Sequence, residues 1–207
     1  MTKQIGLTLL ETILALVIGV IIIMGVLVYY QSTSDNGNRV ATIKMVGDIG
    51  TAVRAYAQSP DYKSGPINLS VLQDSGLLTA ADMANPWSVD PASLQVSTSG
   101  NYLGIRFSNV PAAASTVSGS SKPGGICGSL ATQLSASLPL PSPGTVTMKY
   151  YGVTNTYTIT TGGGVTASWK TAGGAQQSYN SSGAAMCQFQ TSGDTSWGVL
   201  SVVMDLS

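Results

Sequence analysis

The sequence predicts an α+β protein in which a long N-terminal helix packs on a globular domain built around an antiparallel β-sheet. Three observations support this fold class. Residues 12–30 form an unbroken, mostly aliphatic run, and no proline occurs before Pro60. Farther along, side chains alternate in character from Tyr102 to Asn109, which is the period-two pattern of a β-strand. The helix therefore comes first, and the sheet belongs to the second part of the chain.

The apolar run is long enough to cross a bilayer. It holds nineteen uncharged residues between Thr12 and Tyr30, and about 20 apolar residues suffice for a membrane helix. Lys3 precedes the run, so the positive-inside rule places the amino terminus in the cytoplasm. A cleaved secretory signal is the alternative. It fits less well, because the run is long and no small-residue exit site precedes Asp35.

The helix is expected to continue past the apolar run as an amphipathic segment. A stripe of apolar residues recurs at roughly three-residue spacing, with charged residues between its members. A helix from Leu7 to Gln58 would be about 78 Å long at 1.5 Å per residue. We divide it into an apolar half, residues 7–34, and an amphipathic half, residues 35–58. The turn signal Asn36-Gly37-Asn38 leaves open a split into two helices. The stripe consists of Val40, Ile43, Val46, Ile49, Val53 and Tyr56.

The globular part is expected to span residues 59–207. Short helices are predicted within 68–76, which Gly76 would end, and over 126–138, where apolar residues recur every four positions. Asn85-Pro86-Trp87 is expected to form a turn closed by a buried aromatic ring. The predicted strands are 102–109, 146–151, 157–161, 185–190 and 197–206, with 153–156 as the connection of a hairpin.

The two cysteines, Cys127 and Cys187, both follow the apolar run and would lie on its far side. An isolated pair in an exported domain is typical of a disulfide. Closing a loop of about 60 residues would stabilise the fold by roughly 4 kcal/mol. Two buried free thiols are the alternative. Metal binding is less favoured, since no third or fourth ligand lies nearby.

The composition argues against several classes of function. Nine basic and nine acidic side chains balance, and no basic patch indicates nucleic-acid binding. Histidine, the commonest general base and metal ligand, is absent. Gly162-Gly163-Gly164 lacks the helix-opening Lys-Ser/Thr of a phosphate loop. We therefore expect no catalytic, cofactor-binding or metal-binding residues and no enzymatic activity; a membrane-anchored exported enzyme remains an alternative.

Glu11, the only glutamate of the chain, lies at the edge of the apolar run. A carboxylate held at the centre of a membrane helix costs roughly 2.5–3.5 kcal/mol on insertion scales, so we look for a functional partner. A cut between Gly6 and Leu7 would create a positive α-amino group at Leu7, four residues before Glu11. Residues four apart share a helix face. The alternative is a signal anchor that tolerates one acid.

The residues around this cut resemble a site known from one protein family. The segment from Lys3 to Glu11 resembles the prepilin processing site of the type IV pilins. The resemblance implies that residues 1–6 are a leader, that a prepilin peptidase cuts after Gly6 and methylates Leu7, and that Glu11 guides assembly. The family more often has phenylalanine at the first mature position; leucine there favours the type IVb branch, although the leader is short for that branch.

Two further features resemble type IVb members. The membrane segment lacks the helix-kinking proline of many pilins, and residues 29–35 are similar to bundle-forming and conjugative-pilus pilins. By the same resemblance, the region bounded by Cys127 and Cys187 packs against neighbouring subunits and displays the variable surface.

The implied function is that of the major structural subunit of a helical filament. The partners would be other copies of the chain, the prepilin peptidase and the pilus assembly machinery. The precursor would lie in the inner membrane, and the assembled pilus would be extracellular, where it contacts host or bacterial cell surfaces in adhesion, aggregation or conjugation. A minor pilin or a type II secretion pseudopilin is the alternative function.

Overall fold

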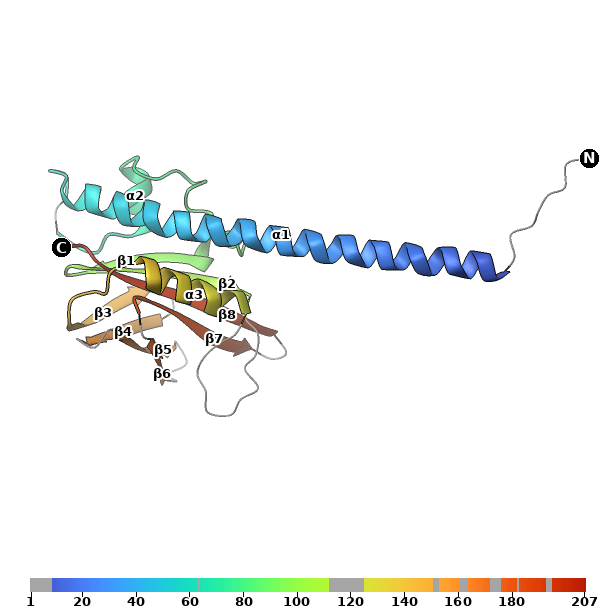
Figure 1. The fold of residues 1–207 in the computed structure, drawn as a ribbon. Helices are drawn as coiled ribbons and strands as arrows, with labels where there is room; N and C mark the ends of the chain where they lie inside the picture. The colour runs from blue at the N-terminus through green and yellow to red at the C-terminus, as the bar shows by residue number, and fades with distance from the viewer. Residues whose placement is uncertain are drawn as a thin grey trace, which may run out of the picture. The chain divides into compact units, whose positions relative to one another are not determined.

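The computed structural model describes residues 9–62, 64–111, 125–150, 153–160, 164–171, 176–181, 183–192 and 195–207. Within these residues the chain is an α+β protein with a long N-terminal helix and antiparallel sheets (Figure 1). It divides into two compact units, Met1–Asn38 and Arg39–Ser207. The helical elements are α1 (Leu9–Ala57), α2 (Leu69–Asp74), the 3-10 helix η1 (Pro91–Ser93) and α3 (Gly125–Ser137). The strands are β1 (Leu94–Ser99), β2 (Tyr102–Val110), β3 (Gly144–Tyr150), β4 (Val153–Thr160), β5 (Gly164–Thr171), β6 (Gln176–Ser181), β7 (Ala185–Ser192) and β8 (Thr195–Asp205).

Helix α1 is continuous. It runs through Asn36, Gly37 and Asn38 without a break, so the turn considered there does not form. It ends at Ala57, one residue before the expected end. A single glycine costs a helix only about 1 kcal/mol relative to alanine, and the residues on both sides favour helix.

The strands of the second unit form two four-stranded antiparallel sheets. The first has the order β1-β2-β8-β7, and the second has the order β3-β4-β5-β6. One face of the first sheet packs against α3 and the part of α1 that belongs to this unit, and its other face packs against the second sheet (Figure 1). The second unit is therefore layered helix, sheet, sheet.

Strand β2 packs against the helices with one face and against the second sheet with the other. Leu103, Ile105 and Phe107 point into the core beneath the helices. Gly104, on the opposite face, lies against the second sheet: a Cβ built there would overlap the side chains of Met148 and Tyr150. Side chains alternate across a strand, so both faces of β2 are buried.

Several strand predictions need correction. Residues 153–156, expected to connect a hairpin, lie inside β4, because the register pairs Tyr150 with Val153 and leaves room for only two residues between the strands. Strands β1, β5 and β6 were not predicted. Strands β2, β7 and β8 lie within a few residues of the expected bounds, as do α2 and α3.

The buried face of the second half of α1 also differs from the predicted stripe. Val46, Ile49 and Val53 are buried as expected, but Val40 is 68% exposed and Ile43 is 36% exposed. The face that packs on the sheet is rotated toward Thr42, Met45 and Ala52, which are all buried. A spacing of three residues drifts around a helix of 3.6 residues per turn, so the first members of the predicted stripe leave the packed face.

Candidate functional site

The first half of α1 presents apolar side chains on all sides. Every large hydrophobic side chain from Ile13 to Tyr30 that the structure describes is at least half exposed. The helix satisfies the length and composition of a membrane span, with a mean hydropathy of 2.8 in its most apolar window. Such a surface is unfavourable in water, since burying one large aliphatic side chain is worth about 1.5–3 kcal/mol. This segment fits a membrane anchor or signal by length and composition.

The residues of the predicted processing site lie at the edge of the described chain. Gly6 and Leu7 fall outside the described residues. Glu11 lies within α1, so its backbone is helical, but its side chain is outside the described part. The cleavage, methylation and assembly roles of these three residues stay predictions.

The second half of α1 is held on the first sheet by apolar packing and by polar contacts at two points. Trp87 Nε1 donates to Thr42 Oγ1 at 2.8 Å. Near the end of the helix, Arg54 Nη2 donates to the carbonyl oxygen of Asp205 at 3.0 Å. Each contact ties α1 to a segment distant in sequence, so the globular unit fixes this part of the helix at both ends.

The Asn85-Pro86-Trp87 turn positions the first of these contacts. The buried Asn85 Nδ2 donates to the Ser93 hydroxyl at 2.8 Å and to the Ser108 carbonyl at 3.0 Å. Its Oδ1 accepts from Trp87 N at 3.0 Å, which orients the indole ring toward α1. The predicted turn is present, but its aromatic ring is not fully buried as expected: Trp87 is only partly buried.

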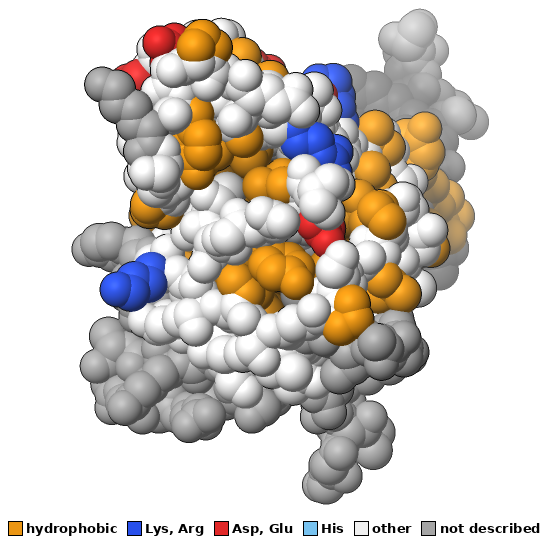
Figure 2. Space-filling view, turned by 90° about the vertical axis from the view of Figure 1, so that its left-hand side faces the viewer, with side chains coloured by type: hydrophobic (Ala, Val, Ile, Leu, Met, Phe, Trp, Pro, Cys, Tyr) orange, Lys and Arg blue, Asp and Glu red, His pale blue; other side chains and the backbone are white. Residues whose placement is uncertain are grey.

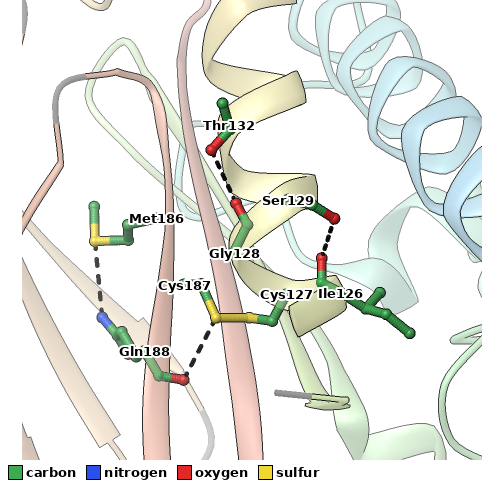
Figure 3. The surroundings of a disulfide bond; sticks show 8 residues. All are labelled: Ile126, Cys127, Gly128, Ser129, Thr132, Met186, Cys187 and Gln188. Carbon is green, nitrogen blue, oxygen red and sulfur yellow. Dashed lines mark hydrogen bonds between the residues drawn. A yellow bond between two sulfur atoms is a disulfide. The ribbon is translucent and has the colours of Figure 1, made fainter. Parts of the chain in front are cut away.

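Cys127 and Cys187 form the predicted disulfide, with their Cα atoms 5.6 Å apart (Figure 3). Cys127 lies in the first turn of α3 and Cys187 lies on β7, so the bond joins helix to sheet across 60 residues of sequence. Both residues are buried in the main core. Gly198 on β8 makes room for the bond: a Cβ there would lie 2.7 Å from Cys127 Sγ.

A cluster of hydrogen bonds surrounds the carboxylate of Asp205, the last residue of β8. The carboxylate accepts from Ser142 N at 3.1 Å and Oγ at 2.6 Å, and from Ser207 N at 3.0 Å and Oγ at 2.7 Å. These hydrogen bonds hold the pKa of Asp205 well below its ordinary value, and the bond from the Ser142 hydroxyl has the largest effect. Tyr102 adds a hydrogen bond from its hydroxyl to the Ser142 carbonyl at 3.0 Å. The cluster links α1, β2, β8 and the segment before β3.

The polar residues between the two sheets are also held in place. Arg106 is buried, and its Nη1 donates to Gln95 Oε1 at 3.1 Å. Burial lowers the pKa of Arg106, and burial together with the neighbouring Tyr157 raises the pKa of Tyr150 well above its ordinary value. These groups lie inside the sandwich, so they contribute to packing between the sheets.

A surface hollow of about 480 Å³ lies where α1 ends, beside α2. Its charged lining residues are Asp61 and Asp74, and Tyr56 and Leu77 supply apolar surface. Across the described residues, no group of three or more His, Cys, Asp or Glu side chains is placed to hold a metal ion. On the face drawn in Figure 2, charged side chains are few.

Comparison with known proteins adds no relative: no protein family, curated protein or solved structure matches this chain. Sequence reasoning missed the Thr42–Trp87 bond and the Asp205 cluster. The burial of Thr42 could have been predicted, because Thr42 lies four residues before the buried Val46 and so shares its helix face. The Asp205 cluster joins segments 63 residues apart, so no local sequence pattern predicts it.

Proposed function

We propose that this chain is the structural subunit of an extracellular helical filament of the type IV pilin class. The observation that carries the proposal is the contrast between the two halves of α1. The described apolar side chains before residue 31 are exposed, whereas Val46, Ile49 and Val53 are buried in the domain. The first half needs lipid or copies of itself as cover, and the second half attaches the helix to a folded domain.

The proposed assembly moves this apolar helix from lipid into a bundle of identical helices. Both environments remove the side chains from water, so a free subunit in water is strongly disfavoured. The disulfide and the Asp205 cluster brace the exported domain. Closing the loop between the two cysteines is worth about 4 kcal/mol on the chain-entropy description, which suits a domain exposed outside the cell.

In this proposal, Glu11 sets the register of assembly. A carboxylate inside an apolar bundle is tolerated only opposite a positive group, here the amino terminus created at Leu7. A subunit that enters out of register leaves both charges unpaired and is rejected. The positions of Gly6, Leu7 and Glu11 in the sequence support this reading.

Substitution of Glu11 tests the proposal. Glu11→Ala and Glu11→Val should abolish filaments on the cell surface while leaving removal of residues 1–6 unchanged, because the acid is needed for register and not for cutting. The two readouts are filament yield after shearing and the mass of the membrane-held chain. Asp35→Asn, which removes another carboxylate from the same helix, is the matched control and should retain filaments. Normal filament yield from either Glu11 variant would refute the assembly role.

A further inference from the structure

Helix α1 contains one stretch made entirely of residues that are typical of turns and helix ends. We call residues 32–38 the polar segment. Serine, threonine, aspartate and asparagine side chains hydrogen-bond to nearby backbone groups in non-helical conformations, which makes them poor residues for a helix interior. Glycine loses the most conformational freedom when it enters a helix. The segment consists of Ser32, Thr33, Ser34, Asp35, Asn36, Gly37 and Asn38.

The polar segment has little cover from the rest of the chain. Its residues are exposed except for Asp35 and Asn38, which are half-buried. Among the described residues of α1, the first buried one is Thr42, which lies beyond the segment. The boundary between the two compact units falls directly after Asn38. The helical state of the segment therefore depends on its backbone hydrogen bonds and on the helix that continues from both of its ends.

The side chains around the polar segment also do little to hold it. Thr33 Oγ1 donates to the carbonyl oxygen of Tyr29 at 3.0 Å, a type of bond that slightly destabilises and often bends a helix. Arg39 follows the segment, and its Nε is buried without a hydrogen-bond partner. Asp35 lies four residues before Arg39, but no ion pair joins the two in the described chain. A buried donor without a partner costs free energy, so the closed helix keeps an unfavourable group at this end.

We propose that the polar segment is a built-in opening point of α1, which leaves the helix transiently while the residues on both sides stay helical. Local opening is expected where few apolar contacts are buried and backbone hydrogen bonds face solvent. The helix on either side is held by other means. Met45, Val46 and Ile49 anchor the second half in the domain core, and the apolar run before the segment is stabilised wherever lipid or detergent covers it.

Opening of the polar segment frees the globular unit to turn without a change in the helix on either side. Seven residues span about 10 Å as a helix and up to about 24 Å when extended. A short polar segment that contains glycine and serine then behaves as a flexible linker. Movement of the domain is thereby separated from the apolar half of α1. This device does not depend on the assembly proposed above, because a domain anchored in a membrane would use it in the same way.

Amide hydrogen exchange measures this opening directly. We would record it by nuclear magnetic resonance on the full chain in detergent micelles. Each helical N–H bonds to the carbonyl four residues earlier, so the amides of residues 36–41 lose their partners when the polar segment opens. The amides of residues 49–53, in the packed half of the same helix, are the reference. Gly37→Ala and Gly47→Ala are matched variants, because a Cβ at either position meets nothing within 4 Å.

The expected result is a local minimum of protection against exchange. After correction for the intrinsic rate of each amide, protection at residues 36–41 should be at least about tenfold below that at residues 49–53 and should rise again in the apolar run. Gly37→Ala should raise protection at the minimum about fivefold, the factor implied by the difference in helix propensity between glycine and alanine. Gly47→Ala should leave the minimum unchanged.

Three results would overturn the proposal. The first is equal protection at residues 36–41 and 49–53. The second is protection that falls steadily toward the amino terminus without recovery in the apolar run, which would indicate fraying from the domain. The third is a minimum that responds to Gly47→Ala as strongly as to Gly37→Ala. Because micelles contain no filament, failure of filament assembly leaves this test unaffected.

Discussion

At the scale of single residues, the absence of one side chain allows the two sheets to meet. Gly104 lies on β2 where Met148 and Tyr150 of β3 cross it, and a Cβ would overlap both. Its φ is not among the positive values of the chain, so glycine is needed here for space. Alternation from Tyr102 to Asn109 predicted the strand. It did not predict that the second sheet would cover the face bearing Gly104 and Arg106, because a strand face without large apolar side chains is ordinarily exposed to solvent.

Gly104→Ala should therefore destabilise the domain by about 1–3 kcal/mol, the usual cost of overpacking a closely packed core. Thermal unfolding followed by near-ultraviolet circular dichroism would measure this. Gly47→Ala is the matched control: the Cβ meets nothing within 4 Å, and replacing glycine inside a helix should stabilise by about 0.5–1 kcal/mol. A harmless Gly104→Ala would contradict the close approach of the two sheets.

The Asp205 carboxylate gives the fold a dependence on pH. Its pKa is lowered in the folded chain, first by the Ser142 hydroxyl, so it stabilises the fold above the unfolded value of about 3.9. That stabilisation is lost as the pH falls from there toward the folded pKa. Asp205→Asn should cost about 1 kcal/mol near neutral pH, a modest value because the group is partly exposed.

The difference in unfolding free energy between wild type and Asp205→Asn should stay constant from pH 7 to about 5 and shrink below about pH 4. Urea titrations at a series of pH values would measure it. Asp74→Asn, an exposed aspartate on α2, provides the comparison and should change stability little at neutral pH. A difference for Asp205→Asn that grows on acidification would contradict the assigned role of the carboxylate.

At the scale of elements, α1 is one helix with two different surroundings. Its two-part character could be predicted, since an apolar run followed by an amphipathic pattern is a strong local signal. Its continuity through Asn36, Gly37 and Asn38 was left open by the sequence and is settled by the structure. The face that packs on the sheet was only partly predicted: Val46 and Ile49 are buried but Val40 is not. Which side of a helix meets the sheet depends on tertiary contacts such as Thr42 with Trp87, and those leave little trace in the local pattern.

The same substitution should destabilise the globular unit in the second half of α1 and leave its stability unchanged in the first half. Ile49 is fully buried and Ile21 is 63% exposed. Ile49→Ala should lower the unfolding free energy of the globular unit by about 2–5 kcal/mol because it leaves a cavity. Ile21→Ala should leave it unchanged. Chemical unfolding in detergent, followed by the near-ultraviolet signal of the domain, gives both values, and similar losses at the two positions would refute the division of the helix.

The second sheet was harder to predict than the first. Strands β5 and β6 are rich in Gly, Ser, Thr and Gln, and their few apolar residues gave no clear period. They are held by pairing with β4 and by burial of Val165 and Ala167 between the sheets. Their strand structure thus depends on neighbours more than on intrinsic preference.

At the scale of the whole molecule, the disulfide joins α3 to the first sheet inside the main core. The pairing of Cys127 with Cys187 could be predicted because only two cysteines exist. Replacing both by serine should destabilise the domain by about 4 kcal/mol, mainly by freeing the unfolded chain. Thermal unfolding of the double variant beside wild type would measure the loss, and an unchanged midpoint would show that the bond does not brace the fold.

The central claim is that the apolar helix serves as the core of a filament after processing. The most direct measurement is intact and amino-terminal mass spectrometry of filaments sheared from cells that express the chain. We predict a chain that begins at a methylated Leu7 and has Cys127 and Cys187 oxidised. A chain that still carries the residues before Leu7, or that is found only in membranes, would contradict the account and favour a membrane-anchored domain.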